Sequence, residues 1–201
     1  MKAPCFIIVL LFLSFSVWAE DKVVLFLGDS LTAGYGVLKE ESYPELLGVA
    51  WNKEGRKIKI INGAESGSLA SSLPSRLDFF LKRFKPHLIV IASGGNDARQ
   101  LTKISEIEKS LKQTIEISQK SGAKVALQAM EIFPNLGKEY VDQFKVMYPR
   151  LAQKTKVTLL PFMLKNIAGK SEFNQADGFH PNAKGHDMIS QFLKPYLEKL
   201  L

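Results

Sequence analysis

Residues 23–36 read VVLFLGDSLTAGYG, and this stretch decides how the rest of the chain is interpreted. Five consecutive apolar strand formers predict a strand buried on both faces, as in a parallel sheet. A turn at Gly28 would place Asp29 and Ser30 at the carboxyl end of that strand. Ligands of open α/β sheets bind at this edge. Ser30 is therefore either a nucleophile or only the cap of the following helix.

Similar apolar runs recur along the chain, and segments with helical spacing separate them. Strands alternating with helices predict parallel pairing through right-handed crossovers, with helices on both faces of the sheet. The carboxyl ends of all five strands would then meet at one edge. Ser105 and Glu108 predict a capping box at the start of one helix. The expected strands are 23–27, 58–61, 88–92, 124–129 and 157–160, and three expected helices are 43–54, 104–119 and 183–199.

The composition is that of an ordinary globular protein with a basic balance. The 201 residues are enough for one domain with a full core, and 27 Lys plus Arg stand against 20 Asp plus Glu. These cations fall into small, separated groups. A solvated surface is therefore expected, with no nucleic-acid partner. Transient contact with an anionic membrane surface is the alternative, and a monomer is expected by default.

Residues 1–19 have the pattern of a signal peptide. Lys2 precedes an apolar run at 6–18, and Val17-Trp18-Ala19 forms a small-x-small cleavage site before Glu20. The run is shorter than the roughly 20 residues of a comfortable bilayer span. We expect cleavage and a periplasmic or secreted domain at 20–201, with an uncleaved anchor as the alternative. Cys5, the single cysteine, would leave with the signal.

Three residue types needed for acyl transfer follow predicted strands or precede the last helix. Ser30 can supply a nucleophilic hydroxyl, and His180, with an ordinary imidazole pKa of about 6.5, can act as its base. Asp177 lies three residues before His180, so a tight turn could bring its carboxylate to one ring nitrogen. A catalytic triad is defined by geometry and not by chain order. Taken singly, Asp177 and His180 could equally be a structural cap and its partner.

Stabilisation of an oxyanion requires hydrogen-bond donors near that nucleophile. The candidates are the backbone N–H groups of Ser30 and Gly67 and the side-chain amide of Asn96. A residue without Cβ lets substrate approach the backbone closely, which suits Gly67. Singly, Gly67 and Asn96 would be ordinary turn residues. Their joint occurrence in loops at one sheet edge favours the functional interpretation.

These segments resemble the four sequence blocks of the SGNH (GDSL-type) hydrolase superfamily. The blocks are GDSL at 28–31, Gly67, GGND at 94–97 and DGFH at 177–180, in family order along the whole predicted domain. The stretches GDSLTAGYGV, GGNDARQL, LLPFMLKNIAG and DGFHPNAKGHDMI are most similar to the secreted bacterial thioesterase/arylesterase/lysophospholipase branch. Ser68 departs from the pattern, which has Asp there, and this leaves the hydrogen bonding of that loop open.

This resemblance implies a flavodoxin-like three-layer α/β/α sandwich with a five-stranded parallel sheet. It also implies hydrolysis of esters and thioesters by a serine nucleophile, with a small-molecule or lipid acyl ester as substrate and without cofactor or metal. A carbohydrate O-acetylesterase acting on glycans is the alternative function, and a non-catalytic binding protein is a third. The intact set of Ser30, Asp177 and His180 argues against the last.

Apolar residues in the same loops are candidates for an acyl-binding groove. A groove would favour long acyl chains, because each buried methylene contributes up to about 0.8 kcal/mol. The alternative is that these side chains pack inward as loop anchors. The candidates are Leu101, Ile132, Phe133, Pro134, Leu136 and Phe179.

The other two histidines are not expected at the site. His87 lies at the mouth of the third strand, at the opposite edge, where a structural role is expected. His186 lies six residues after His180 in the last predicted helix and is expected to be exposed. Scattered histidines and the absence of an H-E-x-x-H motif predict no protein-built metal site.

Overall fold

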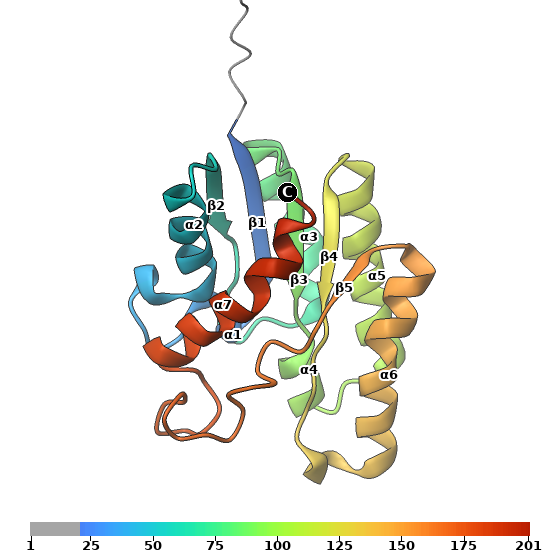
Figure 1. The fold of residues 1–201 in the computed structure, drawn as a ribbon. Helices are drawn as coiled ribbons and strands as arrows, with labels where there is room; N and C mark the ends of the chain where they lie inside the picture. Colours follow the sequence, from blue (N-terminus) through green and yellow to red (C-terminus); the bar gives the residue numbers. More distant parts are fainter. Residues whose placement is uncertain (1–20) are drawn as a thin grey trace, which may run out of the picture.

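The fold is that of a computed structural model, which describes residues 21–201 (Figure 1). The predicted signal peptide lies outside these residues. Five parallel strands form one sheet in the order β2-β1-β3-β4-β5, which is the flavodoxin-like order. The predicted α/β class and five-stranded parallel sheet are therefore confirmed. The strands are β1 (Lys22–Gly28), β2 (Ile58–Asn62), β3 (Leu88–Ala92), β4 (Lys124–Gln128) and β5 (Thr158–Leu160).

Helices cover both faces of this sheet. α2 and α7 pack against each other on one face, while α3, α5 and α6 form the layer on the other (Figure 1). Short helices α1 and α4 follow β1 and β3 directly, at the carboxyl edge. The helices are α1 (Ser30–Ala33), α2 (Tyr43–Lys53), α3 (Leu73–Phe84), α4 (Gly95–Arg99), α5 (Ile104–Lys120), α6 (Lys138–Thr155) and α7 (Ala183–Glu198), with 3₁₀ turns at Lys39–Glu41, Ala70–Ser72 and Pro134–Leu136.

The central strands are buried on both faces, as their unbroken apolar runs predict. Residues 24–27 of β1 and all five residues of β3 are buried between the two helical layers. β1 pairs with β2 on one side and with β3 on the other, with Phe26 opposite Asn62 and Val90. This central position fixes the end of β1 in the sheet, and with it the start of α1, which carries Ser30.

α5 begins where the sequence predicted, but it is not capped as predicted. The helix begins at Ile104, its N-cap position is Lys103, and no side chain caps it. The predicted capping box of Ser105 and Glu108 is wrong. Ile104 is buried and extends the apolar stripe of Ile107 and Leu111, so packing starts the helix two residues before the position that an N-cap at Ser105 would give.

The placement of His186 also corrects the expectation from sequence. It is completely buried in α7, where its Nδ1 accepts a hydrogen bond from the Tyr43 backbone N–H at 3.3 Å. Its ring stacks on that of Tyr43 with 6.2 Å between centroids. Because α7 packs on α2, the helix face that carries His186 points inward.

Within residues 21–201, no helix combines the length and apolar character needed to cross a bilayer.

Candidate active site

Ser30 is positioned by the junction of β1 and α1. Gly28 ends the strand, and a Cβ there would lie 2.6 Å from the Ala92 carbonyl oxygen, so only glycine fits. Asp29 is the N-cap of α1, and its Oδ1 accepts a hydrogen bond from the Leu31 backbone N–H at 3.1 Å. Ser30 is the first residue of the helix and is 8% exposed. Its backbone N–H has no acceptor within the helix, because first-turn N–H groups never do.

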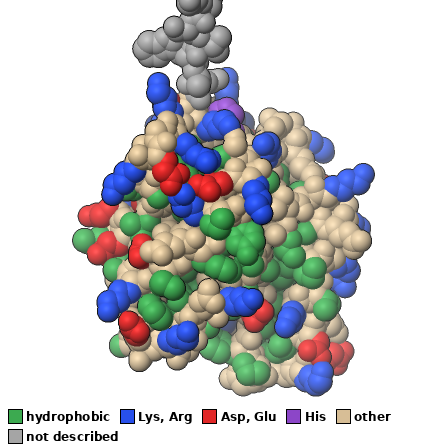
Figure 2. Space-filling view, viewed as in Figure 1, with side chains coloured by type: hydrophobic (Ala, Val, Ile, Leu, Met, Phe, Trp, Pro, Cys, Tyr) green, Lys and Arg blue, Asp and Glu red, His purple; other side chains and the backbone are tan. Residues whose placement is uncertain are grey.

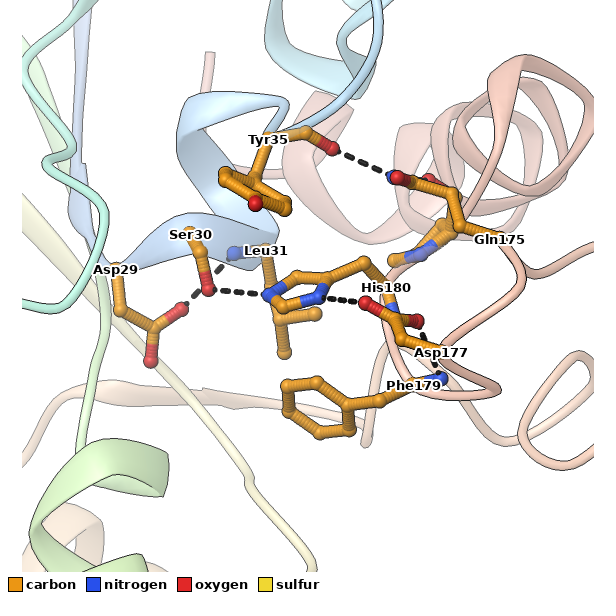
Figure 3. A network of polar contacts seen from close by, with 9 residues as sticks. Asp29, Ser30, Leu31, Tyr35, Gln175, Asp177, Phe179 and His180 are labelled. Atoms are coloured by element: carbon orange, nitrogen blue, oxygen red, sulfur yellow. Dashed lines mark hydrogen bonds and ion pairs between the residues drawn. The ribbon is translucent and has the colours of Figure 1, made fainter.

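His180 connects Ser30 to Asp177 through two hydrogen bonds (Figure 3). Its Nε2 lies 2.9 Å from Ser30 Oγ, and its Nδ1 lies 2.6 Å from Asp177 Oδ2. A carboxylate can only accept, so Nδ1 carries the proton and Nε2 is left to accept from the serine hydroxyl. The structure thus brings together the three residues that the sequence proposed as a triad, from segments 150 positions apart.

Asp177 is held in its ionised form by the turn that it starts. The hydrogen bond from His180 and those from the backbone N–H groups of Phe179 and His180, both 2.9 Å from Oδ1, lower its pKa to about 2. The carboxylate can therefore orient the imidazole at neutral pH and stabilise the imidazolium that forms on proton transfer.

Gln175 ties the loop that carries His180 to the loop that follows α1. Its side-chain amide donates to the carbonyl oxygens of Tyr35, at 2.6 Å, and Pro181, at 2.9 Å (Figure 3). Its backbone N–H donates to the His180 carbonyl at 2.8 Å. The ring of Tyr35 lies against the imidazole, with 4.7 Å between centroids. These contacts fix His180 relative to Ser30 across the site.

Gly67 lies in a loop and Asn96 near the start of α4, and hydrogen bonds join both segments to the end of β1. Gly67 has φ +80°, which favours glycine, and a Cβ there would point into open space. Asn96 Nδ2 donates to the Ser68 carbonyl at 3.1 Å, and Ser68 Oγ donates to the Gly28 carbonyl at 3.1 Å. Ser68, the departure from the family pattern, thus makes a hydrogen bond of its own between this loop and the strand that carries Ser30.

Two carboxyl groups are buried beneath these loops. Burial raises the pKa of Asp29 to about 6, against the lowering effects of its Leu31 hydrogen bond and the nearby His180. Burial likewise raises the pKa of Asp97, whose Oδ2 accepts from the Ala70 backbone N–H at 2.9 Å. Both side chains hold loops in place: Asp29 caps α1, and Asp97 ties α4 to the turn after Gly67.

An apolar cavity of about 200 Å³ lies beside the site. Leu31, next to Ser30, Gly95, next to Asn96, and Phe179, next to His180, all contribute to its lining. Of the candidates from sequence, Ile132, Phe133, Pro134, Leu136 and Phe179 line the cavity. The rings of Phe133 and Phe179 contact each other, with 5.7 Å between centroids.

Leu101 does not line this cavity. It lies in the turn after α4 with φ +54° and is 58% exposed, so its side chain points to solvent. Sequence reasoning instead missed lining residues from α1, α4 and the loops after β4 and β5. Leu31 carried a signal, because it follows the nucleophile, whereas the others depend on how these segments fold. The missed residues include Leu31, Met130, Phe162 and Leu164, with Arg99 and Glu131 as charged members.

Among residues 21–201, no three His, Cys, Asp or Glu side chains form a group that could hold a metal ion.

Hydrogen bonds link a serine to a histidine and that histidine to a carboxylate, at the carboxyl edge of a parallel α/β sheet. This arrangement is typical of serine hydrolases. Within this class, residues 26–188 match the GDSL-like Lipase/Acylhydrolase family, and the chain belongs to that family.

Characterised relatives cover almost the whole chain. An arylesterase of Vibrio mimicus is 36% identical over 183 residues, which are 91% of each protein. The thioesterase 1/protease 1/lysophospholipase L1 of Escherichia coli K12 is 31% identical over 192 residues, or 96% of this chain and 90% of that one. The esterase EstA of a Pseudoalteromonas species, solved in a form inhibited by monoethylphosphonate, superimposes with a TM-score of 0.86. That structure is 31% identical and matches 89% of this chain and 98% of its own. The protein is thus an enzyme that hydrolyses esters and thioesters.

Proposed function

We propose that this protein is a hydrolase of medium-chain fatty-acyl esters and thioesters that acts through a covalent acyl-enzyme on Ser30. The observation that carries the proposal is the pair of hydrogen bonds of His180, from Nε2 to Ser30 Oγ at 2.9 Å and from Nδ1 to Asp177 Oδ2 at 2.6 Å. The adjoining apolar cavity is the evidence for a fatty-acyl substrate, because it could bind an acyl chain.

In the proposed acylation step, Ser30 Oγ attacks the substrate carbonyl carbon while His180 Nε2 takes the hydroxyl proton. Asp177, ionised because of its lowered pKa, stabilises the imidazolium. The carbonyl oxygen becomes an oxyanion that accepts hydrogen bonds from the backbone N–H groups of Ser30 and Gly67 and from Asn96 Nδ2. The intermediate then collapses, and the leaving alcohol or thiol receives the proton from His180.

Deacylation repeats these steps with water. His180 Nε2 removes a proton from a water molecule, which attacks the acyl carbonyl carbon and forms a second tetrahedral intermediate. Its collapse breaks the bond to Ser30 Oγ, which regains its proton from His180, and the free fatty acid leaves.

A fluorophosphonate probe tests the assignment of the nucleophile. The wild-type protein should be labelled, and Ser30→Ala should lose both labelling and several orders of magnitude of ester turnover. Ser75→Ala, which changes an exposed serine of α3, should behave as wild type. Labelling that persists at another serine in the Ser30→Ala protein would overturn the proposal.

A series of p-nitrophenyl esters tests the acyl-chain preference. Burial of six more methylenes would contribute about 3–5 kcal/mol, so kcat/KM should rise several hundred-fold from acetyl to octanoyl before losses from chain ordering. Phe133→Ala should flatten this rise and leave acetyl ester turnover nearly unchanged. A flat or falling series, with efficient release of acetate from acetylated glycans, would instead support the carbohydrate O-acetylesterase.

The sequence of residues 1–19 supports export and cleavage near Glu20. Expressed with its own leader, the protein should appear in the periplasm or the medium, and N-terminal sequencing should begin near Glu20. A sequence that begins at Met1 in a membrane fraction would favour the uncleaved anchor.

A further inference from the structure

Cationic side chains gather at the edge of the sheet opposite the site. Because the strands are parallel, their five amino ends meet there, and each has a lysine at its first residue or within the three residues before it. These five lysines are exposed and come from five separate stretches of the chain. We call this surface the amino pole and define it by Lys22, Lys57, Lys85, Lys124 and Lys156.

Helix termini add further cations to the amino pole. α5, α6 and α7 return to this edge, and Lys120, Lys154 and Lys199 lie at or near their last residues. Cations at such positions stabilise helices through the macrodipole. The same explanation covers Lys85 and Lys156, which are the C-cap residues of α3 and α6. It does not extend to Lys22 and Lys124, which begin strands.

Three acidic side chains lie near this edge: Asp21, Glu54 and Glu198. Glu54 and Glu198 are paired with Lys194 at 2.6 and 2.7 Å. The ammonium groups of Lys22 and Lys124 hydrogen-bond to the terminal backbone oxygens of Leu201 and Leu200. Figure 2 shows several blue side chains around the upper end of the molecule, where β1 begins, with red side chains just below them.

The amino pole contains a cleft of about 540 Å³ with a mixed lining. Lys22, Lys85 and Lys124 contribute charge, and Leu200 and Leu201 contribute apolar surface. An inorganic anion would make no use of the leucines. Single-stranded nucleic acid binds through stacking on aromatic rings, and none of the described residues that line this cleft is Phe, Tyr or Trp. Phosphate beside hydrocarbon is the combination that a phospholipid offers.

We propose that the amino pole is a docking surface for an anionic phospholipid bilayer. The chain itself supports this orientation, since the apolar run at 6–18 ends only three residues before Lys22. That connection spans at most about 14 Å when fully extended. A leader inserted in the membrane therefore holds the amino pole at the headgroups, and the lysines remain there to bind them after cleavage.

Docking by this surface leaves the catalytic edge free. The seven residues of β1 separate the two edges of the sheet by about 20 Å. Ser30 and the apolar cavity then face away from the bilayer, so the docked enzyme acts on ester molecules in the aqueous phase.

Co-sedimentation with vesicles tests the proposal. The protein should bind vesicles of phosphatidylcholine mixed with phosphatidylglycerol, bind pure phosphatidylcholine vesicles weakly, and dissociate at high salt. The triple variant Lys85→Glu, Lys120→Glu, Lys156→Glu should bind the anionic vesicles at least about tenfold more weakly. The matched control Lys109→Glu, Lys145→Glu, Lys165→Glu has the same net charge on other exposed positions and should stay within about twofold of wild type.

Hydrolysis of p-nitrophenyl butyrate keeps this test separate from the proposed function. Both triple variants should hydrolyse it as wild type does, which shows that they are folded, and saturating anionic vesicles should not inhibit turnover. Equal binding to neutral vesicles, equal loss in the control variant, or tighter binding to a DNA oligonucleotide with the same sensitivity to the variants would overturn the lipid assignment. Inhibition by vesicles would overturn the orientation. If the wild-type protein had no esterase activity, this would contradict the proposed function and would not bear on the binding to vesicles.

Discussion

The side-chain amide of Asn96 makes one hydrogen bond through its nitrogen and has a second N–H to donate. Its amide donates to the Ser68 carbonyl at 3.1 Å, which orients the side chain and leaves the other N–H of the same group for an oxyanion. A preorganised donor of this kind stabilises the transition state without reorganising during the reaction.

Asn96→Ala should therefore lower kcat by about 10²–10³ and change KM little, which is the usual scale for loss of one oxyanion donor. Steady-state kinetics on a p-nitrophenyl ester measures this effect. Asn166→Ala, at an exposed position after β5, serves as the control and should match wild type. Activity of Asn96→Ala within about twofold of wild type would make Asn96 only a turn residue.

Asp29 and His186 are buried titratable groups whose effects on stability oppose each other. The pKa of Asp29 is raised from 3.8 to about 6, so between these values the folded state binds a proton that the unfolded state does not, and stability falls as pH rises. Burial lowers the pKa of His186 from 6.5 to about 4, so there the unfolded state binds the extra proton and stability rises with pH. Each effect amounts to about 3 kcal/mol.

Removal of either group should leave the pH dependence of stability that the other group causes. Asn can still cap α1, so the free energy of unfolding of Asp29→Asn should rise as the pH increases from about 4 to 6.5. The free energy of unfolding of His186→Gln should fall over the same pH range. Urea unfolding at several pH values measures both slopes. Parallel curves for the two variants would contradict the assignment of these pKa shifts.

At the scale of elements, two loops that are far apart in sequence must meet for His180 to reach Ser30. The segment between β5 and α7 carries Asp177 and His180, and Asn182 caps α7 by accepting from the Gly185 backbone N–H at 3.0 Å. Gln175 joins this segment to Tyr35. A Cβ on Gly36 would lie 2.1 Å from the Gln175 side chain, so the glycine leaves room for this joint.

Gln175→Ala should lower kcat by about tenfold or more while KM stays nearly constant, because small misplacement of a catalytic group is enough to slow the reaction. The melting temperature should change little, since the lost bonds lie in a surface segment. Gln143→Ala on the outer side of α6 is the matched control. A kcat equal to that of wild type would show that the remaining turn contacts are enough to position His180.

At the scale of the whole molecule, stability rests on one hydrophobic core. The side chains of β1, β3 and β4 form its centre, and the cluster draws on all the larger helices. Cys5 is the single cysteine of the sequence and precedes this core. No disulfide within residues 20–201 can therefore contribute.

A chain that begins at Glu20 should fold when expressed without its leader. Its melting temperature should be the same with and without dithiothreitol, because it has no disulfide to reduce. Differential scanning calorimetry measures both values. A shift of several degrees on reduction, or a failure to fold without the leader, would show that residues 1–19 contribute to the native state.

The sequence by itself determined the layers, the strands and the triad candidates. A strand that is apolar on both faces must be buried between two helical layers. The segments that follow parallel strands all begin at the same edge of the sheet. This is why Ser30 and Asn96 could be placed together before their contacts were known. The chemistry of the loop residues also pointed to Gly67, Asp177 and His180, and the motif blocks agree with that choice.

Tertiary structure decided what depends on contacts between distant segments. Leu101 turns to solvent while Phe162 enters the cavity, because loop conformation and not polarity sets which apolar side chains face substrate. His186 is buried because α7 lies on α2. The lysines appear dispersed along the chain, yet a parallel sheet collects the starts of its strands at one pole. Proximity between such segments depends on which elements pack together, and local sequence does not specify it.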